Sequence, residues 1–149
     1  MRAKLFFLAV FCMAATAIQA QKYAVLDFET GSQIDTEEAE SITHLFLTNF
    51  HPAQYCEIDR QRINGVIGEL GFPAVGLNHQ QITKLGRVLE ASFIVVGSIR
   101  EKSGEYIVDV RAIDISTGTT VATAGDAFKK SKYRKKVKSI ANKLAKKIK

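Results

Sequence analysis

The sequence predicts an α/β (α+β) domain in which five strands are packed with helices. Strand-forming apolar runs alternate with segments of helical apolar spacing, in the order strand, helix, strand, helix, helix, three strands, helix. Residues 21–149 number 129, which suits one compact domain with one core. No internal repeat, low-complexity tract or linker divides them, so we expect a single domain.

Residues 1–20, MRAKLFFLAVFCMAATAIQA, have the anatomy of a secretory signal peptide. Arg2 and Lys4 give a basic start, an apolar run follows, and small residues lead to Ala20. The apolar run is shorter than the roughly 20 residues that a spanning helix needs. We therefore expect an exported protein that is cleaved after Ala20 and does not cross the membrane. Cys12 lies inside the apolar run, so a lipid anchor there is not expected.

The first predicted strand is the apolar run Lys22–Phe28. Asp35 with Glu38 resembles a capping box and predicts the start of a helix that Pro52 helps to end. A short second strand is expected at Tyr55–Ile58, where apolar residues resume.

Two further helices are predicted from their caps. Asp59 is a suitable N-cap for a helix that Gly71 closes, and Asn78 with Gln81 forms a second capping-box pattern. Gly86 falls inside the latter helix, where glycine costs about 1 kcal/mol relative to alanine. We therefore expect a close contact at Gly86.

The second half of the chain predicts three strands and a helix. Phe93–Val96 holds consecutive apolar residues, which favours a central strand covered on both faces. A turn at Lys102–Glu105 leads into Tyr106–Ile115, and Thr120–Ala124 returns as the fifth strand. In Tyr106–Ile115, alternation places one apolar set on one side and a mixed set on the other: Tyr106, Val108, Val110 and Ala112 against Ile107, Asp109, Arg111 and Ile113. Residues 131–149 have the spacing of an amphipathic helix.

The net charge of +6 conceals an acidic body and a basic tail. Residues 21–128 contain 8 basic and 15 acidic residues, whereas residues 129–149 contain 11 basic residues and no acidic one. The C-terminal helix is expected to dock on the sheet with its lysines in water, and it also fits an interfacial helix that attracts anionic lipid or another polyanion. The candidate surface-binding residues are Lys135, Lys136, Lys143 and Lys147. Tyr133 is the one aromatic residue there, so nucleic acid is not an expected partner.

The sequence shows no pattern of a catalytic, cofactor or metal site. His44, His51 and His79 lack ligand spacing and are expected to be surface or structural residues. Nucleophile-elbow and phosphate-loop patterns are absent from the sequence. Asp27 and Glu29 could form an acid/base pair at a strand end, but solvated carboxylates are the favoured interpretation.

Cys56 is the one cysteine that remains after cleavage of the signal peptide, so no internal disulfide is expected. It lies in QYCEI, which favours a small buried thiol. An intermolecular disulfide and a reactive thiol are the alternatives.

Four segments in order resemble the CsgG-like envelope domains: AVLDFE, EIDRQRINGVIGELG, ITKLGRVLEASFIVVGSI and VDVRAIDISTGTTVATA. This group includes CsgG, FlgO, LpoB and the amino-terminal domain of TolB. Asp59 and Arg60 stand where the family usually has a Glu-Arg pair, and Val96 and Gly97 stand at its glycine-ended strand. The chain has no room for the membrane hairpins of CsgG and lacks the lipid-bearing cysteine of several relatives.

The resemblance implies a mixed five-stranded sheet with helices and no catalytic residues. It also implies an assembly or regulatory module in the periplasm or at the periplasmic face of the outer membrane. We therefore expect an exported, non-enzymatic domain that binds envelope proteins and requires no cofactor. Self-association is a secondary expectation, because CsgG forms rings. A peripheral binder of anionic lipid or polyanions is the alternative, and a small hydrolase is the least favoured class.

Overall fold

The computed structural model describes residues 20–148 of the chain. The predicted signal peptide therefore lies outside the described residues, apart from Ala20. The elements are β1 (Gln21–Val25), β2 (Glu29–Thr30), α1 (Thr36–Leu47), β3 (Tyr55–Glu57), α2 (Arg60–Glu69), α3 (His79–Leu89), β4 (Phe93–Lys102), β5 (Glu105–Asp114), β6 (Thr120–Lys129), the short 3-10 helix η1 (Lys130–Lys132) and α4 (Tyr133–Lys147).

The sheet has the strand order β3-β1-β4-β5-β6, with the short β2 beside the far half of β4. β3, β1, β2 and β4 pair in parallel, whereas β4, β5 and β6 form an antiparallel meander. The predicted mixed sheet is confirmed, and the two-residue β2 adds a sixth strand to the five expected.

The sixth strand arises from a break in the predicted strand Lys22–Phe28. The Leu26 amide still donates to the Val95 carbonyl at 3.0 Å, but regular pairing with β4 then stops until β2. Phe28 turns its ring onto Gly97, where an added Cβ would lie 2.7 Å from the ring. The break therefore depends on a glycine in the neighbouring strand, which local sequence around Phe28 does not reveal.

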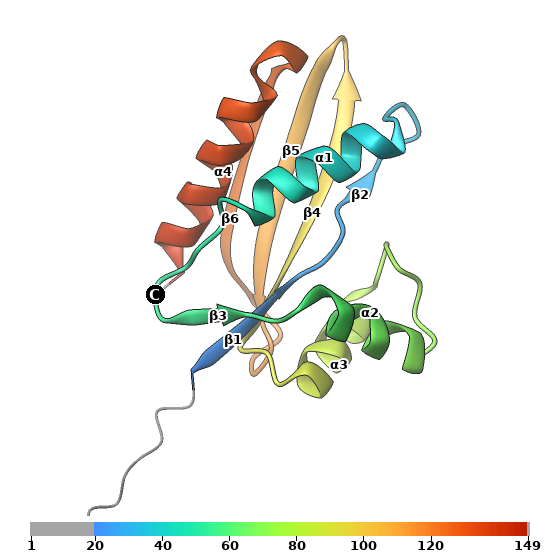
Figure 1. Ribbon diagram of the computed structural model, residues 1–149, viewed down its shortest axis with the longest axis vertical. Coiled ribbons are helices and arrows are strands. Elements are labelled where there is room, and N and C mark those ends of the chain that lie inside the picture. The colour runs from blue at the N-terminus through green and yellow to red at the C-terminus, as the bar shows by residue number, and fades with distance from the viewer. Residues whose placement is uncertain (1–19, 149) are drawn as a thin grey trace, which may run out of the picture.

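Two layers of helices cover the sheet unequally (Figure 1). α1 and α4 lie on one face, where Phe46, Ile140 and Leu144 are fully buried against strand residues such as Val108. α2 and α3 lie on the other face, near β1 and the start of β4, where they bury a second apolar cluster that includes Ile94. The outer halves of β4, β5 and β6 therefore have a helix layer on one face only.

The helix starts differ from the prediction at one point. Asp35 is the N-cap of α1 but makes no side-chain cap bond, so the predicted capping box with Glu38 is wrong. Glu38 instead accepts a hydrogen bond of 2.6 Å from the Tyr106 hydroxyl. The capping box of Asn78 and Gln81 is confirmed, with reciprocal hydrogen bonds of 2.9 Å.

The last two elements are confirmed with shifted ends. β6 continues past the predicted Thr120–Ala124 to Lys129, because Phe128 still faces the core. The chain then forms η1 before α4, so the α-helix begins at Tyr133 rather than at the predicted residue 131.

The expected close contact at Gly86 is confirmed. A Cβ at this position would lie 2.3 Å from Cδ1 and 2.5 Å from Cγ1 of Ile115. Gly86 thus lets α3 approach the segment after β5, and this packing gain offsets the low helix propensity of glycine.

The contact predicts whether a substitution at Gly86 stabilises or destabilises the fold. Gly86→Ala should lower the free energy of unfolding by about 1–3 kcal/mol, because overpacking against Ile115 outweighs the better helix propensity. In an Ile115→Ala background the same change should stabilise the protein by up to about 1 kcal/mol. The matched control is Gly65→Ala in α2, where an added Cβ meets nothing within 4 Å. Urea unfolding measures all four variants, and a Gly86→Ala protein more stable than wild type would contradict the contact.

Candidate protein-interaction surfaces

The uncovered face of β4, β5 and β6 is the largest departure from a fully enclosed sheet. Antiparallel register aligns its side chains in three rows across the strands. We call this set the open face: Arg100, Ile107 and Ala127; Ser98, Asp109 and Gly125; Val96, Arg111 and Thr123. Most of these residues are exposed, while Val96, Ser98 and Ile107 are half-buried. The mixed set predicted for β5 is thus confirmed on this face.

The open face is hollowed over its middle and last rows. A shallow cavity of about 600 Å³ is lined by open-face residues, by Glu29 of β2 and by Lys147 of α4. Gly125 has no side chain to fill the cavity, and the Asp109 carboxylate lies over Gly125. Arg100 neutralises Asp109 at 2.8 Å, which leaves Glu29, Arg111 and Lys147 as the charges of the hollow that have no ion pair within residues 20–148.

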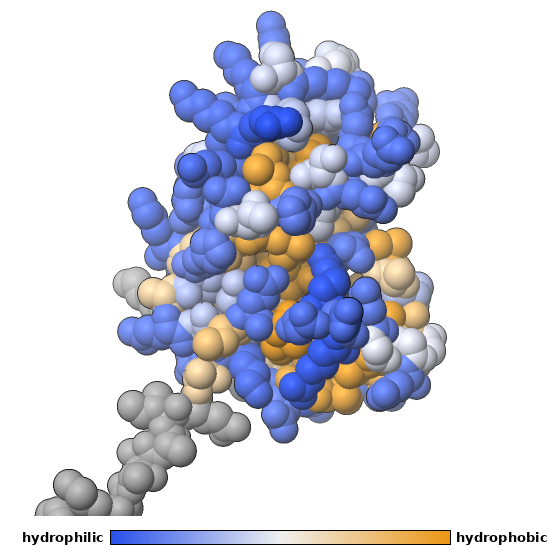
Figure 2. Space-filling view, in the orientation of Figure 1, coloured by the Kyte–Doolittle hydropathy of each residue, from blue (hydrophilic) through white to orange (hydrophobic). Residues whose placement is uncertain are grey.

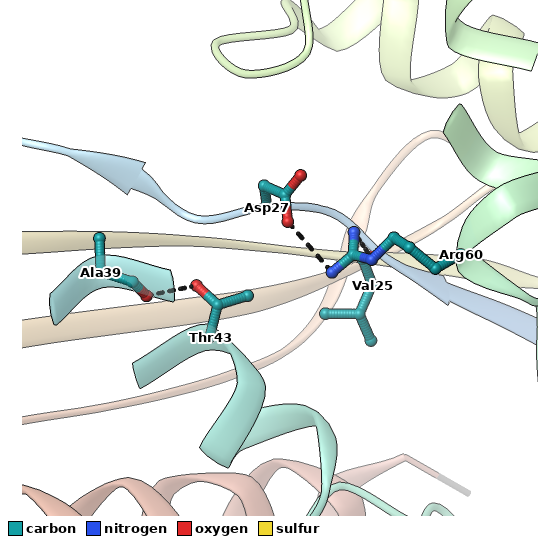
Figure 3. Close-up of polar contacts among 5 residues, drawn as sticks. All are labelled: Val25, Asp27, Ala39, Thr43 and Arg60. Atoms are coloured by element: carbon teal, nitrogen blue, oxygen red, sulfur yellow. Dashed lines mark hydrogen bonds and ion pairs between the residues drawn. The ribbon is translucent and has the colours of Figure 1, made fainter. Parts of the chain in front are cut away.

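Arg60 joins the helices of one layer to the strand end. Its guanidinium donates to the Val25 carbonyl at 3.1 Å and pairs with the Asp27 carboxylate at 3.1 Å (Figure 3). Asp59 next to it caps α2, because its side chain accepts a hydrogen bond of 2.8 Å from the Gln61 amide. Asp27 is thus a half-exposed ion-pair partner, whereas Glu29 stays exposed. These two carboxylates do not form an enclosed acid/base pair.

The four candidate lysines of the basic helix lie in two environments. Lys136 pairs with Asp126 of β6 at 2.8 Å, and the Lys147 ammonium donates to the Thr123 carbonyl at 2.6 Å. Lys143 is exposed on this same strand-facing side, where its charge contributes to the lowered pKa of Asp126. Lys135 is exposed on the side of α4 that faces away from the sheet.

Sequence reasoning missed two members of this outer side. Lys138 and Lys146 follow Lys135 at helical spacing and are exposed, opposite the buried Ile140 and Leu144. We call Lys135, Lys138 and Lys146 the outer lysine stripe. The spacing could have predicted this, because residues three, eight and eleven positions apart lie on one side of a helix.

The Lys136 pair predicts a pH-dependent contribution to stability. The hydrogen bond from Lys136 holds the pKa of Asp126 below its ordinary value. The folded state then binds this proton less tightly than the unfolded state, so the stabilisation is present above the ordinary aspartate pKa and disappears as pH falls through the lowered one. Lys136→Ala should cost about 0.5–1 kcal/mol near pH 7 and less below about pH 3.

Denaturant unfolding at both pH values measures this difference. Lys135→Ala is the matched control and should change stability by less than about 0.5 kcal/mol. Equal costs for Lys136→Ala and Lys135→Ala at pH 7 would contradict a stabilising pair with Asp126.

A polar cluster joins α1 to the sheet at the start of the helix. Besides accepting from Tyr106, Glu38 lies 3.6 Å from the Lys130 ammonium, which approaches Glu101 at 3.0 Å. Burial, with the hydrogen bond to Glu38, raises the pKa of Tyr106 to about 12, so its hydroxyl remains a donor at neutral pH. The cluster therefore has a structural role, and Lys130 and Glu38 are paired within it.

The predicted burial of Cys56 is wrong. The residue is exposed because β3 is a short edge strand, paired on one side with β1. His44, His51 and His79 are exposed, as expected of surface histidines. Within residues 20–148, no three His, Cys, Asp or Glu side chains are grouped closely enough to hold a metal ion. None of the described helices has the length and apolar content to span a membrane.

A family comparison matches residues 76–133 to the FlgO protein family. This segment runs from the loop before α3 through β6 to the first residue of α4, and so includes the whole open face. A comparison with curated protein sequences finds no match.

Solved structures share the fold at low sequence identity. The LpoB C-terminal domain from Salmonella enterica has a TM-score of 0.58 and 13% identity, over 74% of this chain and 84% of that domain. TolB from Acinetobacter baumannii has a TM-score of 0.60 and 11% identity, over 87% of this chain and 28% of TolB. A lipoprotein from Neisseria meningitidis has a TM-score of 0.59 and 10% identity, over 73% of this chain and 80% of the lipoprotein. The predicted resemblance is confirmed: this chain is similar to the FlgO, LpoB and TolB group of envelope proteins.

Proposed function

We propose that the protein is an exported, non-enzymatic module that binds another envelope protein through the open face. The observation that carries the proposal is a hydrophilic, hollowed sheet face without a helix layer, in a domain whose other faces are occupied by α1 to α4. Half-buried Val96 and Ile107 supply apolar area there, and Arg111 with Glu29 supplies charges that fix orientation. The likeness to the LpoB domain and TolB supports an envelope location for such a module.

The proposed location is the periplasm or the periplasmic face of the outer membrane. The signal-peptide pattern in residues 1–20 supports export, and the FlgO match supports an envelope role. We also propose self-association. PelC from Paraburkholderia phytofirmans forms a dodecamer and has a TM-score of 0.50 and 16% identity, over 85% of this chain and 88% of PelC.

Photo-crosslinking in the native host tests the open face. A photoreactive amino acid at Thr123 should give a crosslink to one envelope protein, because Thr123 borders the hollow. The control position is Asn64, which is exposed on α2. Arg111→Glu should reduce the Thr123 crosslink at least about fivefold while the protein keeps its thermal stability. Crosslinks of equal yield from Asn64, or a yield unchanged by Arg111→Glu, would overturn the proposal.

A further inference from the structure

The outer lysine stripe is a cationic surface without a partner in its own molecule. Lys135, Lys138 and Lys146 are exposed and form no ion pair with any residue in 20–148. Lys136 and Lys147, in contrast, contact β6. The positive charge of the stripe is therefore not neutralised by ion pairs within residues 20–148.

The apolar side of α4 is not available to a membrane. Val137, Ile140, Ala141 and Leu144 are fully buried against β5, β6 and α1. An interfacial helix needs an apolar face that enters the lipid. In the folded protein, α4 therefore presents charge alone, so its partner must be an anionic surface that binds without apolar insertion.

The protein carries such an anionic surface at the start of α1. Asp35, Glu37 and Glu40 are exposed there, and none of them pairs with a described cation. Two nearby cations are paired elsewhere: Lys130 contacts Glu38 and Glu101, and Arg100 contacts Asp109. We call Asp35, Glu37 and Glu40 the acidic patch.

The start of α4 lies near the acidic patch, because Tyr133 lines one pocket with Asp35 and Glu37, and the stripe then runs along α4 away from the patch (Figure 1). In Figure 1, α4 lies along the left side and the first turn of α1 points to the right. The space-filling view shows mostly hydrophilic residues over the upper part of this side, with apolar residues showing through in the middle (Figure 2). A contact between the stripe of one copy and the patch of the next therefore repeats head to tail, and such contacts build rings or filaments.

We propose that the outer lysine stripe docks on the acidic patch of a second copy of this chain. The proposal rests on the proposed self-association and not on the binding of another envelope protein by the open face. Charge complementarity carries it: residues 21–128 hold 15 acidic against 8 basic residues, and residues 129–149 hold 11 basic residues and no acidic one.

Sedimentation velocity of residues 21–149 at low and high salt tests the contact. The wild-type protein should form concentration-dependent oligomers at about 50 mM salt and dissociate at about 500 mM salt. Two variants should each weaken self-association by at least about tenfold. They are the stripe variant Lys135→Glu/Lys138→Glu/Lys146→Glu and the patch variant Glu37→Lys/Glu40→Lys. The control Arg62→Glu/Lys84→Glu/Arg87→Glu makes the same charge change on α2 and α3 and should behave as wild type.

An equimolar mixture of the two variants gives the decisive result. The reversed stripe of one variant then faces the reversed patch of the other, and the two native surfaces face each other as well, so oligomers should reappear. Circular dichroism confirms that each variant is folded, which matters because carboxylates in the first turn also stabilise α1. If the patch variant is destabilised, Glu37→Gln/Glu40→Gln replaces it in the self-association measurement and should again weaken the oligomer.

Three outcomes would overturn the proposal. A wild-type monomer at high concentration and low salt would also end the proposed self-association. Oligomers that survive in both variants would end only the assigned contact. A stripe variant that loses binding to vesicles of anionic lipid, with a patch variant that self-associates like wild type, would identify a membrane surface as the partner instead.

Discussion

The two-sided burial of β1 against the first half of β4 is the constraint on which the rest of the fold depends. Ala24, Val25, Ile94 and Val95 are at most 1% exposed, so both faces of this parallel pair must be covered. α1 and α4 cover one face, and α2 with α3 covers the other. Parallel strands are rarely found with an open face, whereas antiparallel strands tolerate one. The uncovered area therefore falls on the antiparallel meander.

This division explains why the open face is a suitable place for function. In their outer halves β5 and β6 contribute only one face to the core, so side chains such as Asp109 and Arg111 remain exposed on the other face. The meander is held rigid from behind by α4, whose apolar side is fully buried. A rigid sheet that presents polar side chains loses little conformational entropy when a partner binds.

Much of the fold could be predicted because local patterns were unambiguous. Consecutive apolar residues at Phe93–Val96 indicated a strand covered on both faces, and alternation in β5 separated an apolar side from a mixed side. The break between β1 and β2 could not be predicted, since it depends on the contact of Phe28 with Gly97 in a distant strand. The predicted burial of Cys56 was wrong for a related reason: apolar residues flank it, but its strand lies at the edge of the sheet. The site was predicted least well, because the lysine count does not say which lysines reach β6.

Hydroxyl-radical footprinting of the protein, purified and in intact cells, tests most directly whether the open face is where it works. Ile107 should react in the purified protein and become protected in cells. Val88, 46% exposed on α3, should react equally in both, and buried Val108 in neither. Equal reactivity of Ile107 in the two states, or protection of Val88 instead, would show that the open face is not the binding surface.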